Sequence, residues 1–203
     1  MSEFDDKAAT WDENPDRVRR AVEIANYLKE HTSLIGVKKA MEYGSGTGLL
    51  SFALQDTLPD ITLMDGSEEM TKVAQQKVND QDVLNLYPLH YDLMEQPLPK
   101  ERYDLIFILQ TLHHIDDTTG FIERAYNLLN RGGQLAIIDL EKEDGSFHDG
   151  PFHGHKGFVR KELERQLTST GFSIEHYGVC WKIEKEIEGH KKVFPLFMMI
   201  GKK

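Results

Sequence analysis

The feature that most constrains the fold is an alternation along the chain between short apolar runs and segments with helical periodicity. The apolar runs, which we expect to be strands, are Ala40–Tyr43, Ile61–Met64, Val83–Leu89, Tyr103–Leu109 and Leu135–Leu140. The helical patterns placed among them are Leu49–Leu54, Glu68–Val78, Phe121–Leu129 and Val159–Leu167. Strands that alternate with helices pair in parallel, and the helices pack on the sheet. The order therefore predicts an α/β fold with a mostly parallel sheet and helices on both faces.

The two ends of the chain depart from this alternation. Near the N-terminus, Asn14 followed by Pro15 is a typical helix start, and apolar residues then recur at helical spacing at Val18, Ala21, Val22, Ala25 and Leu28. Near the C-terminus, Ser173–Ile183 and Lys192–Ile200 are extended runs joined by EKEIEGHKK, with no helix-length pattern between them. We expect an amphipathic helix first and a C-terminal antiparallel hairpin at the edge or end of the sheet.

Composition favours one folded domain and disfavours nucleic acid as a partner. The 203 residues are 39% hydrophobic and contain no internal repeat or low-complexity linker, so we expect residues 1–203 to form a single domain. Asp and Glu number 34 against 24 Lys and Arg, which gives a formal net charge of −10. Because a phosphate backbone is normally met by a basic face, we expect no nucleic-acid partner.

Cysteine content and hydropathy indicate a cytoplasmic protein. Cys180 is the single cysteine, so no intrachain disulfide framework is expected. The N-terminal residues mix acidic and basic side chains and lack the apolar core of a signal peptide, and no apolar stretch reaches membrane-spanning length. We expect a cytoplasmic monomer or homodimer without a membrane span.

Three glycines, Gly44, Gly46 and Gly48, lie where the first expected strand turns into its helix. Such a turn lets backbone N–H groups and a helix N-terminus approach a ligand at the carboxyl ends of parallel strands. A dinucleotide fingerprint would have its third glycine where this chain has Leu49. Glu42, on the strand itself, would repel a pyrophosphate but suits a ligand that carries an ammonium group.

A second acidic residue, Asp65, indicates a further feature of the ligand. Asp65 ends the second expected strand, which is the usual place for a carboxylate that accepts from both ribose hydroxyls. Gly66 and Ser67 follow it and by themselves also fit a turn with a helix N-cap at Ser67, and the two roles are compatible. The glycines could likewise serve only a tight turn, but that reading leaves the spaced acids unexplained. The ligand should carry a ribose, a positive charge and no phosphate.

These motifs, with further stretches in the same order, resemble the class I S-adenosylmethionine-dependent methyltransferases of Rossmann-like fold. Within them the chain is similar to the small single-domain enzymes of the ubiquinone and menaquinone biosynthesis type. The further stretches are FDDKAATWD, LHYDL, YDLIFILQTLHHI and LLNRGGQLAIIDL. The resemblance covers nearly the whole chain, and it implies S-adenosylmethionine as the cofactor and S-adenosylhomocysteine as the product.

The resemblance also implies roles for individual residues. Asp92 takes the place of the acid that recognises adenine, and residues 110–114 line the mouth of the pocket. Residues 1–36 correspond to an N-terminal lid and helix, and residues 37–203 to the cofactor-binding core. Trp11 belongs to the lid, although a buried anchor for the N-terminal helix is an equal alternative. The predicted cofactor-binding residues are Trp11, Glu42, Gly44, Ser45, Gly46, Asp65, Gly66, Met70, Asp92, Leu93 and Gln110.

The histidines are candidates for acceptor binding, proton removal or metal binding. His113 and His114 begin a loop that opens into the expected pocket, and three more histidines lie in GSFHDGPFHGHKGF after the fifth strand. A metal held by His148, Asp149, His153 and His155 is conceivable, but their spacing matches no standard zinc pattern, and we predict no metal. If a catalytic base exists, His114 and His153 are the candidates, because an unperturbed imidazole titrates near neutral pH.

The implied reaction is transfer of a methyl group to a small-molecule acceptor by direct displacement. Positioning alone can supply roughly 7–11 kcal/mol of the barrier reduction, so a catalytic base is optional. The expected pocket wall mixes histidine with Ile115, Phe152 and Phe158, which suits a small, partly apolar acceptor with one polar group. Two other classes remain open. A cofactor-binding sensor without turnover is disfavoured by the histidine pair, and a nucleotide-dependent oxidoreductase is disfavoured by the glycine spacing.

Overall fold

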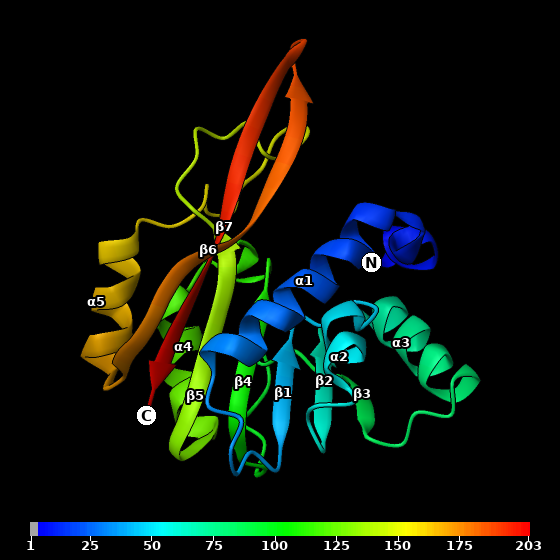
Figure 1. The fold of residues 1–203 in the computed structure, drawn as a ribbon, viewed down its shortest axis with the longest axis vertical. Coiled ribbons are helices and arrows are strands. Elements are labelled where there is room, and N and C mark those ends of the chain that lie inside the picture. Colours follow the sequence, from blue (N-terminus) through cyan, green and yellow to red (C-terminus); the bar gives the residue numbers. More distant parts are fainter. Residues whose placement is uncertain (1–3) are drawn as a thin grey trace.

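Seven strands form one sheet in the order β3-β2-β1-β4-β5-β7-β6 (Figure 1). The computed structural model describes residues 4–203, so residues 1–3 of the expected N-terminal segment lie outside the described residues. The parallel strands are β1 (Ala40–Tyr43), β2 (Ile61–Asp65), β3 (Leu86–His90), β4 (Tyr103–Leu109) and β5 (Leu129–Leu140). The antiparallel hairpin is β6 (Ser173–Ile187) and β7 (His190–Lys202), with β7 paired to β5. The predicted α/β architecture is confirmed.

The strand order reverses next to β1. The chain moves from β1 outward to β2 and β3, and then returns to place β4 on the other side of β1. In an open parallel sheet the crevice at such a switch point, beyond the carboxyl ends of the strands, is where ligands bind. The loops that follow Tyr43 and Leu109 are therefore the ones positioned to meet a ligand.

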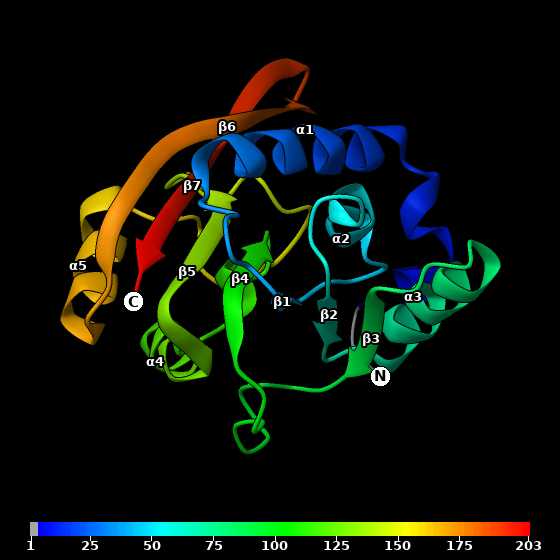
Figure 2. The same cartoon turned by 60° about the horizontal axis from the view of Figure 1, so that its bottom comes forward.

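Helices cover both faces of the sheet, as Figure 2 shows. One core packs α1 (Pro15–His31), α2 (Leu49–Leu54) and α3 (Glu68–Asp80) against alternate strand residues such as Leu63 and Phe107. The other packs α4 (Thr118–Leu128) and α5 (Arg160–Thr170) against the residues between them, such as Met64 and Ile106. Because successive strand residues point to opposite faces, one set of strands fills both cores.

Two details of the sequence expectation were wrong. In α1 the buried residues are Ala21, Ile24, Ala25 and Leu28, whereas Val18 and Val22 are 38% and 45% exposed. Burial follows the stripe that packs on α2 and β6, and the two valines lie beside that stripe. The strand β5 begins at Leu129 rather than Leu135, because Leu129 pairs with Tyr103 before a register shift, and regular pairing with β4 resumes at Gln134. The N-cap of α1 is confirmed, since the Asn14 side chain accepts from Asp16 N.

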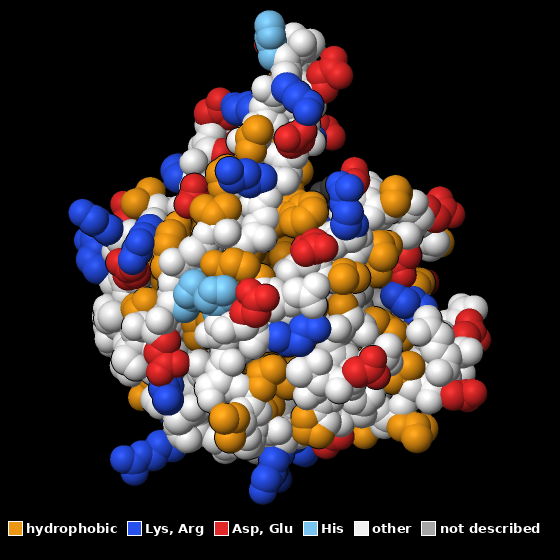
Figure 3. Space-filling model, viewed as in Figure 1, with side chains coloured by type: hydrophobic (Ala, Val, Ile, Leu, Met, Phe, Trp, Pro, Cys, Tyr) orange, Lys and Arg blue, Asp and Glu red, His pale blue; other side chains and the backbone are white. Residues whose placement is uncertain are grey.

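The β6–β7 hairpin extends past the sheet at the end where the N-terminal residues also lie (Figure 1). On the face in Figure 3, Lys and Arg side chains are dispersed among Asp and Glu and form no single basic patch. None of the helices within residues 4–203 combines the length and apolar character needed to cross a membrane.

Candidate functional site

All three glycines of the loop after β1 have positive φ angles, +67° at Gly44, +54° at Gly46 and +82° at Gly48. A Cβ added to Gly44 would lie 2.2 Å from the Thr111 side chain, so the loop after β1 and the loop after β4 meet here without room for a side chain. Gly46 differs, because the nearest atoms to its added Cβ are 3.9 and 4.0 Å away. The loop is therefore tightly packed at Gly44 and leaves space in front of Gly46.

The Asp65 carboxylate lies at the end of β2 and holds the glycine loop. It accepts from Gly46 N at 2.7 Å and from Ser67 N at 2.7 Å. Burial raises the pKa of Asp65, and the two backbone donors oppose that rise. A carboxylate has about four lone-pair directions, so two remain for hydroxyl donors. Ser67 also caps α3 by accepting from Met70 N, which confirms the predicted N-cap.

Asp92 lies beside Asp65 across Gly66. A Cβ on Gly66 would be 3.7 Å from Asp92 Oδ2, while Asp92 Oδ1 accepts from Met94 N and from the Tyr43 hydroxyl. The following Leu93 is fully buried. Two carboxylates thus lie at the carboxyl ends of neighbouring strands, at the places that the family resemblance implied.

Glu42 is 2% exposed and does not reach the surface of the loop. Its Oε2 accepts from both the backbone N and the hydroxyl of Ser51, in the first turn of α2. Burial raises the pKa of Glu42 to about 8, although the Ser51 hydrogen bonds lower it. Ser45, in the glycine loop itself, is also buried. Glu42 and Ser45 therefore pack inside the protein behind the loop.

The N-terminal segment covers the glycine loop as a 3-10 helix, η1 (Asp5–Glu13). Trp11 Nε1 and Met70 Sδ are the atoms nearest the open face of Gly46, and the Arg17 guanidinium lies 3.9 Å from the centroid of the Trp11 ring. Polar contacts tie η1 down, with Lys77 Nζ 2.6 Å from Asp12 Oδ2 and Ser67 Oγ 2.6 Å from Asp5 Oδ1. Trp11 is half-buried and lies over the loop, a place that suits both the lid and the anchor interpretation.

Gln110 follows β4 with a φ of +48°, an unusual value for a residue with a side chain. Its backbone N donates to Ile138 O on β5 at 2.8 Å, and the next residue, Thr111, donates to Gly44 O at 3.2 Å. Backbone strain of this kind costs about 1–3 kcal/mol and gathers at ligand-binding turns. Thr111 lies within residues 110–114, which were expected at the mouth of the pocket, but its contact with Gly44 was not predicted, because it depends on a distant glycine.

The two adjacent histidines have different surroundings. His113 is 2% exposed, and its Nδ1 lies 2.6 Å from Oδ1 of Asp139, which is completely buried in β5. His114 is exposed, and its ring contacts those of Phe4 and Phe152 with centroids 5.1 and 5.3 Å apart. The His113–Asp139 pair was missed by sequence reasoning, and the only signal for it is an acid within an otherwise apolar strand.

The loop between β5 and α5 brings one of its three histidines to this pair. His148 lies 5.2 Å from the His113 ring and stacks on Phe152 at 3.6 Å. Burial and the neighbouring His113 lower the pKa of His148, while the Glu143 carboxylate raises it. Gly154 lets the loop pass close by, because a Cβ there would lie 2.2 Å from His113 O.

The other loop residues considered as metal ligands point elsewhere. Asp149 pairs with Lys185 at 3.0 Å, and His155 Nε2 bonds the Ile115 carbonyl at 3.0 Å. His153, one of the two candidate bases, is exposed and takes part in no hydrogen bond, ion pair or ring contact within residues 4–203. The structure thus brings His114 to the mouth of the site and leaves His153 on the surface of the loop.

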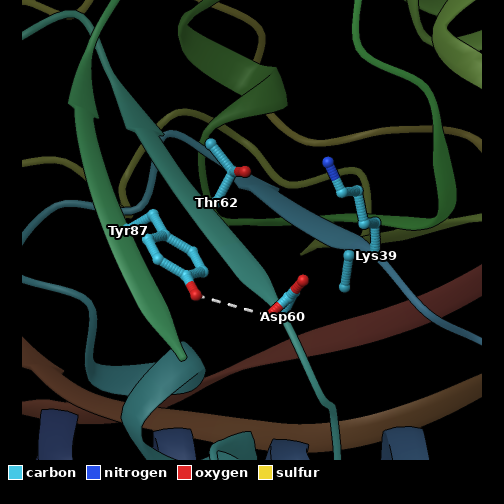
Figure 4. Close-up of a pocket in the computed structure, with 5 residues that line it drawn as sticks. Lys39, Asp60, Thr62 and Tyr87 are labelled. Atoms are coloured by element: carbon cyan, nitrogen blue, oxygen red, sulfur yellow. Dashed lines mark hydrogen bonds between the residues drawn. The ribbon is translucent and has the colours of Figure 1, made fainter. Parts of the chain in front are cut away.

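A separate hollow lies at the opposite end of the sheet, between the starts of β1 and β2 (Figure 4). Lys39, Asp60, Thr62 and Tyr87 line it, and the Tyr87 hydroxyl points to Asp60. None of the predicted site residues is among them. The glycine loop, the two carboxylates and the overlying indole lie together at the carboxyl ends of the strands.

Comparisons with known proteins agree with this geometry. A family model described as a methyltransferase domain matches residues 41–137. A demethylmenaquinone methyltransferase of Listeria monocytogenes is 32% identical over 181 residues, which are 86% of this chain and 75% of that protein. A malonyl-[acyl-carrier protein] O-methyltransferase of Ilyobacter polytropus is 35% identical over 154 residues, which are 71% of this chain and 56% of that protein.

Among solved structures, a SAM-dependent methyltransferase from Aquifex aeolicus has a TM-score of 0.67 and 24% identity, and the match covers 96% of this chain and 97% of that one. This similarity shows the fold. The sequence relatives are methyltransferases by name, and nothing among these comparisons favours a sensor without turnover.

Proposed function

Because the chain belongs to the class I S-adenosylmethionine-dependent methyltransferases, similar to the menaquinone-biosynthesis type, we propose that its acceptor is a small, partly apolar ring compound with one polar group. S-Adenosylmethionine is the cofactor of the family, and when bound it supplies an electrophilic methyl group on a sulfonium. The single observation that carries the proposal is a row of aromatic rings. It runs from Trp11 over the glycine loop, through Phe4, to His114 and Phe152.

The residues present fit the cofactor. The space in front of Gly46 is the cradle that a side chain would fill, and Asp65 keeps lone pairs for the two ribose hydroxyls. Asp92 Oδ2 is available for the adenine amino group and lies next to Gly66. Glu42 lies behind the loop, and with a pKa raised to about 8 it becomes a negative charge that favours the ammonium of the methionine part only as the pH approaches that value.

The acceptor side supports a planar, apolar molecule. The Phe4 and Trp11 rings lie 6.2 Å apart and the Phe4 and His114 rings 5.1 Å apart. The aromatic residues of the N-terminal segment therefore contact the aromatic wall formed by His114 and Phe152. Aromatic walls hold ring compounds by stacking and edge contacts. The chain then needs to hold the acceptor in line and exclude water, and His114 is placed to accept a hydrogen bond or a proton from a polar group.

The acceptor is tested with methyl-labelled S-adenosylmethionine and two candidates. One is a reduced demethylated naphthoquinone, the type of compound named for the Listeria relative, and the other is a carrier-linked malonyl group, named for the Ilyobacter relative. We expect label in the ring compound, and we expect Phe152→Ala to raise its KM while S-adenosylhomocysteine affinity stays unchanged. Label in the malonyl group alone would contradict the proposal. Equal KM values of the wild type and Phe152→Ala for the ring compound would also contradict it.

The N-terminal segment is proposed to act as the lid. It is attached through polar contacts at Asp5 and Asp12 and buries little apolar surface beyond Ala8, so it can detach while the sheet stays folded. Removing the residues before Asn14 should leave the fold intact and reduce turnover. If limited proteolysis cuts this segment equally fast with and without saturating S-adenosylhomocysteine, it is not a lid.

We also propose that residues 1–203 act as a single domain in the cytoplasm, as a monomer or homodimer, without a nucleic-acid partner. Support comes from the excess of acidic residues and from Cys180, whose half-buried thiol is free and has its pKa raised to about 12 by burial. Gel filtration with light scattering, with and without added RNA, tests the oligomeric state and the absence of binding.

A further inference from the structure

Three histidines that are far apart in the sequence lie together beyond the carboxyl ends of β4 and β5. A ligand nitrogen of each of His113, His114 and His148 lies within 4.8 Å of the other two. The first two come from the turn after β4, and the third comes from the loop after β5. Nitrogens bound to a tetrahedral Zn²⁺ at about 2.0–2.1 Å lie about 3.4 Å apart, so closing this set requires shifts of about 1.4 Å at most.

His113 is held in the orientation of a metal ligand by Asp139. The carboxylate lies 2.6 Å from Nδ1 and also accepts from His113 N at 3.1 Å, so the ring is fixed and Nε2 is the nitrogen left to ligate. Both side chains are buried, at 2% and 0% exposure. A histidine that donates its other N–H to a carboxylate is the usual partner arrangement of metal-binding histidines.

His148 is also held in place, although it belongs to a long loop. Lys185 on β6 donates to the carbonyl of Phe147 at 2.6 Å and to Asp149 Oδ1 at 3.0 Å, so both neighbours of His148 are tied to the hairpin. The His148 ring stacks on Phe152 at an angle of 9°. The hairpin contacts of Lys185 and the stacking on Phe152 therefore both hold His148 in place.

A buried carboxylate oxygen near the cluster lacks a partner. Within residues 4–203, Glu143 Oε1 is the one buried side-chain oxygen or nitrogen with no hydrogen-bond partner, while Oε2 accepts from Gly145 N and Phe147 N. Its Oε2 thus bonds the backbone of the residue that precedes His148. A buried carboxylate oxygen without a donor is costly unless a positive charge lies nearby, and a metal ion at the cluster would add such a charge.

We infer that His113, His114 and His148 bind one divalent transition-metal ion of the Zn²⁺ type, with Asp139 as the positioning residue. Three imidazoles with an open fourth position form the ligand set that zinc favours in catalytic sites. The sequence prediction of no metal rested on a different set, of which only His148 belongs to this cluster.

The site would lie next to the aromatic wall, since His114 contacts both Phe4 and Phe152. This step rests on the proposed function: with the metal bound, the open coordination position would take an oxygen or nitrogen of the acceptor or of water, and His114 would act as a ligand instead of accepting a proton itself. Metal binding itself does not depend on that function.

The test is a titration of full-length protein, stripped with EDTA and dialysed, with Co²⁺ while visible absorption is recorded. We expect one Co²⁺ per chain and its displacement by Zn²⁺. His148→Ala and His114→Ala should each weaken binding by about 100-fold or more, because even the partners of ligands are worth about 10- to 100-fold. Both side chains are partly or fully exposed, and circular dichroism will establish that the variants are folded.

The matched control is His153→Ala, an exposed histidine of the same loop, which should bind Co²⁺ as the wild type does. Asp139→Asn should weaken binding by about 10- to 100-fold. A wild-type stoichiometry far below one, or unchanged affinity in His148→Ala, would overturn the inference. Since neither cofactor nor acceptor is present, failure here leaves methyl transfer standing, and absence of methyl transfer leaves metal binding standing.

Discussion

The two halves of the candidate site differ in what forms them: backbone conformation in one and side-chain contacts in the other. The half that we propose binds the cofactor, called the cofactor half, lies at the ends of β1, β2 and β3 and is made by backbone conformation, with three glycines at positive φ and carboxylates that accept from backbone N–H groups. The half that we propose binds the acceptor, called the acceptor half, lies at the ends of β4 and β5 and is made by side chains, namely the buried His113–Asp139 pair, the aromatic wall and a loop tied to the hairpin by Lys185.

This difference explains why the halves are unequally visible in the sequence. A backbone conformation that only glycine adopts readily leaves a glycine at a fixed place in the chain. A contact between side chains from β4, β5 and β6 requires only that each residue be of a suitable type, so it leaves no spacing to recognise. The experiments below compare the halves by removing one contact from each.

The largest effect is expected in the acceptor half, from Asp139→Ala. Removing the carboxylate leaves the ring and backbone donors of His113 buried without an acceptor, which should lower the free energy of unfolding by about 3–5 kcal/mol. Urea denaturation measures the change. The control is Asp149→Ala, whose side chain is 95% exposed in its ion pair with Lys185, and it should cost less than about 1 kcal/mol. Similar losses in the two variants would mean that burial of the His113 pair does not matter.

In the cofactor half, Gly44→Ala should be next. The added Cβ would lie 2.2 Å from the Thr111 side chain at a φ of +67°, so strain and crowding together should cost about 2–4 kcal/mol. Gly132→Ala is the matched control, because it has a φ of +81° and no atom within 4 Å, and we expect a loss of about 1 kcal/mol. Thermal unfolding of both variants separates crowding from backbone strain. Equal losses of stability would mean that the contact with Thr111 adds no cost.

Asp65→Ala tests cofactor binding, in a variant first shown by circular dichroism to be folded, because Asp65 also accepts from Gly46 N and Ser67 N. Loss of a charged acceptor for the ribose hydroxyls should raise the Kd of S-adenosylhomocysteine about 10- to 100-fold, equivalent to about 1.4–2.7 kcal/mol. Asp60→Ala, at the opposite end of the same strand segment and beside the hollow of Figure 4, should leave the Kd unchanged. Calorimetry gives both values, and an unchanged Kd for Asp65→Ala would take that residue out of the cofactor site.

The last comparison is a pH dependence that comes from Glu42. Its folded-state pKa is raised to about 8 from 4.5, so between these values the folded state binds more protons than the unfolded state. Stability should therefore fall as pH rises through this window, by at most about 1.4 kcal/mol per pH unit. Glu42→Gln should show a flatter profile than the wild type between pH 5 and about 8 in urea unfolding. Parallel profiles would mean that Glu42 is ionised throughout and that the Ser51 hydrogen bonds outweigh its burial.

Much of the fold could be predicted because its signals are local. Periodicity located every parallel strand, and the lack of a helix between the last two runs indicated the β6–β7 hairpin. The errors arose where packing decided burial, as at Val18 and Val22, or where a register shift before Leu135 separates one further strand pair at Leu129. Hydrophobicity carries no signal in either case.

The sequence by itself determined the strand and helix order, the glycine loop and the carboxylates at Asp65 and Asp92, because each depends on residues close together in the chain. Only the tertiary structure decided that Thr111 closes on Gly44, that Asp139 holds His113, and that His148 rather than His153 joins the histidine pair. Those contacts join segments that meet only after the parallel strands have aligned their carboxyl ends. Their geometry is set by sheet register and loop packing, which no short stretch of sequence contains.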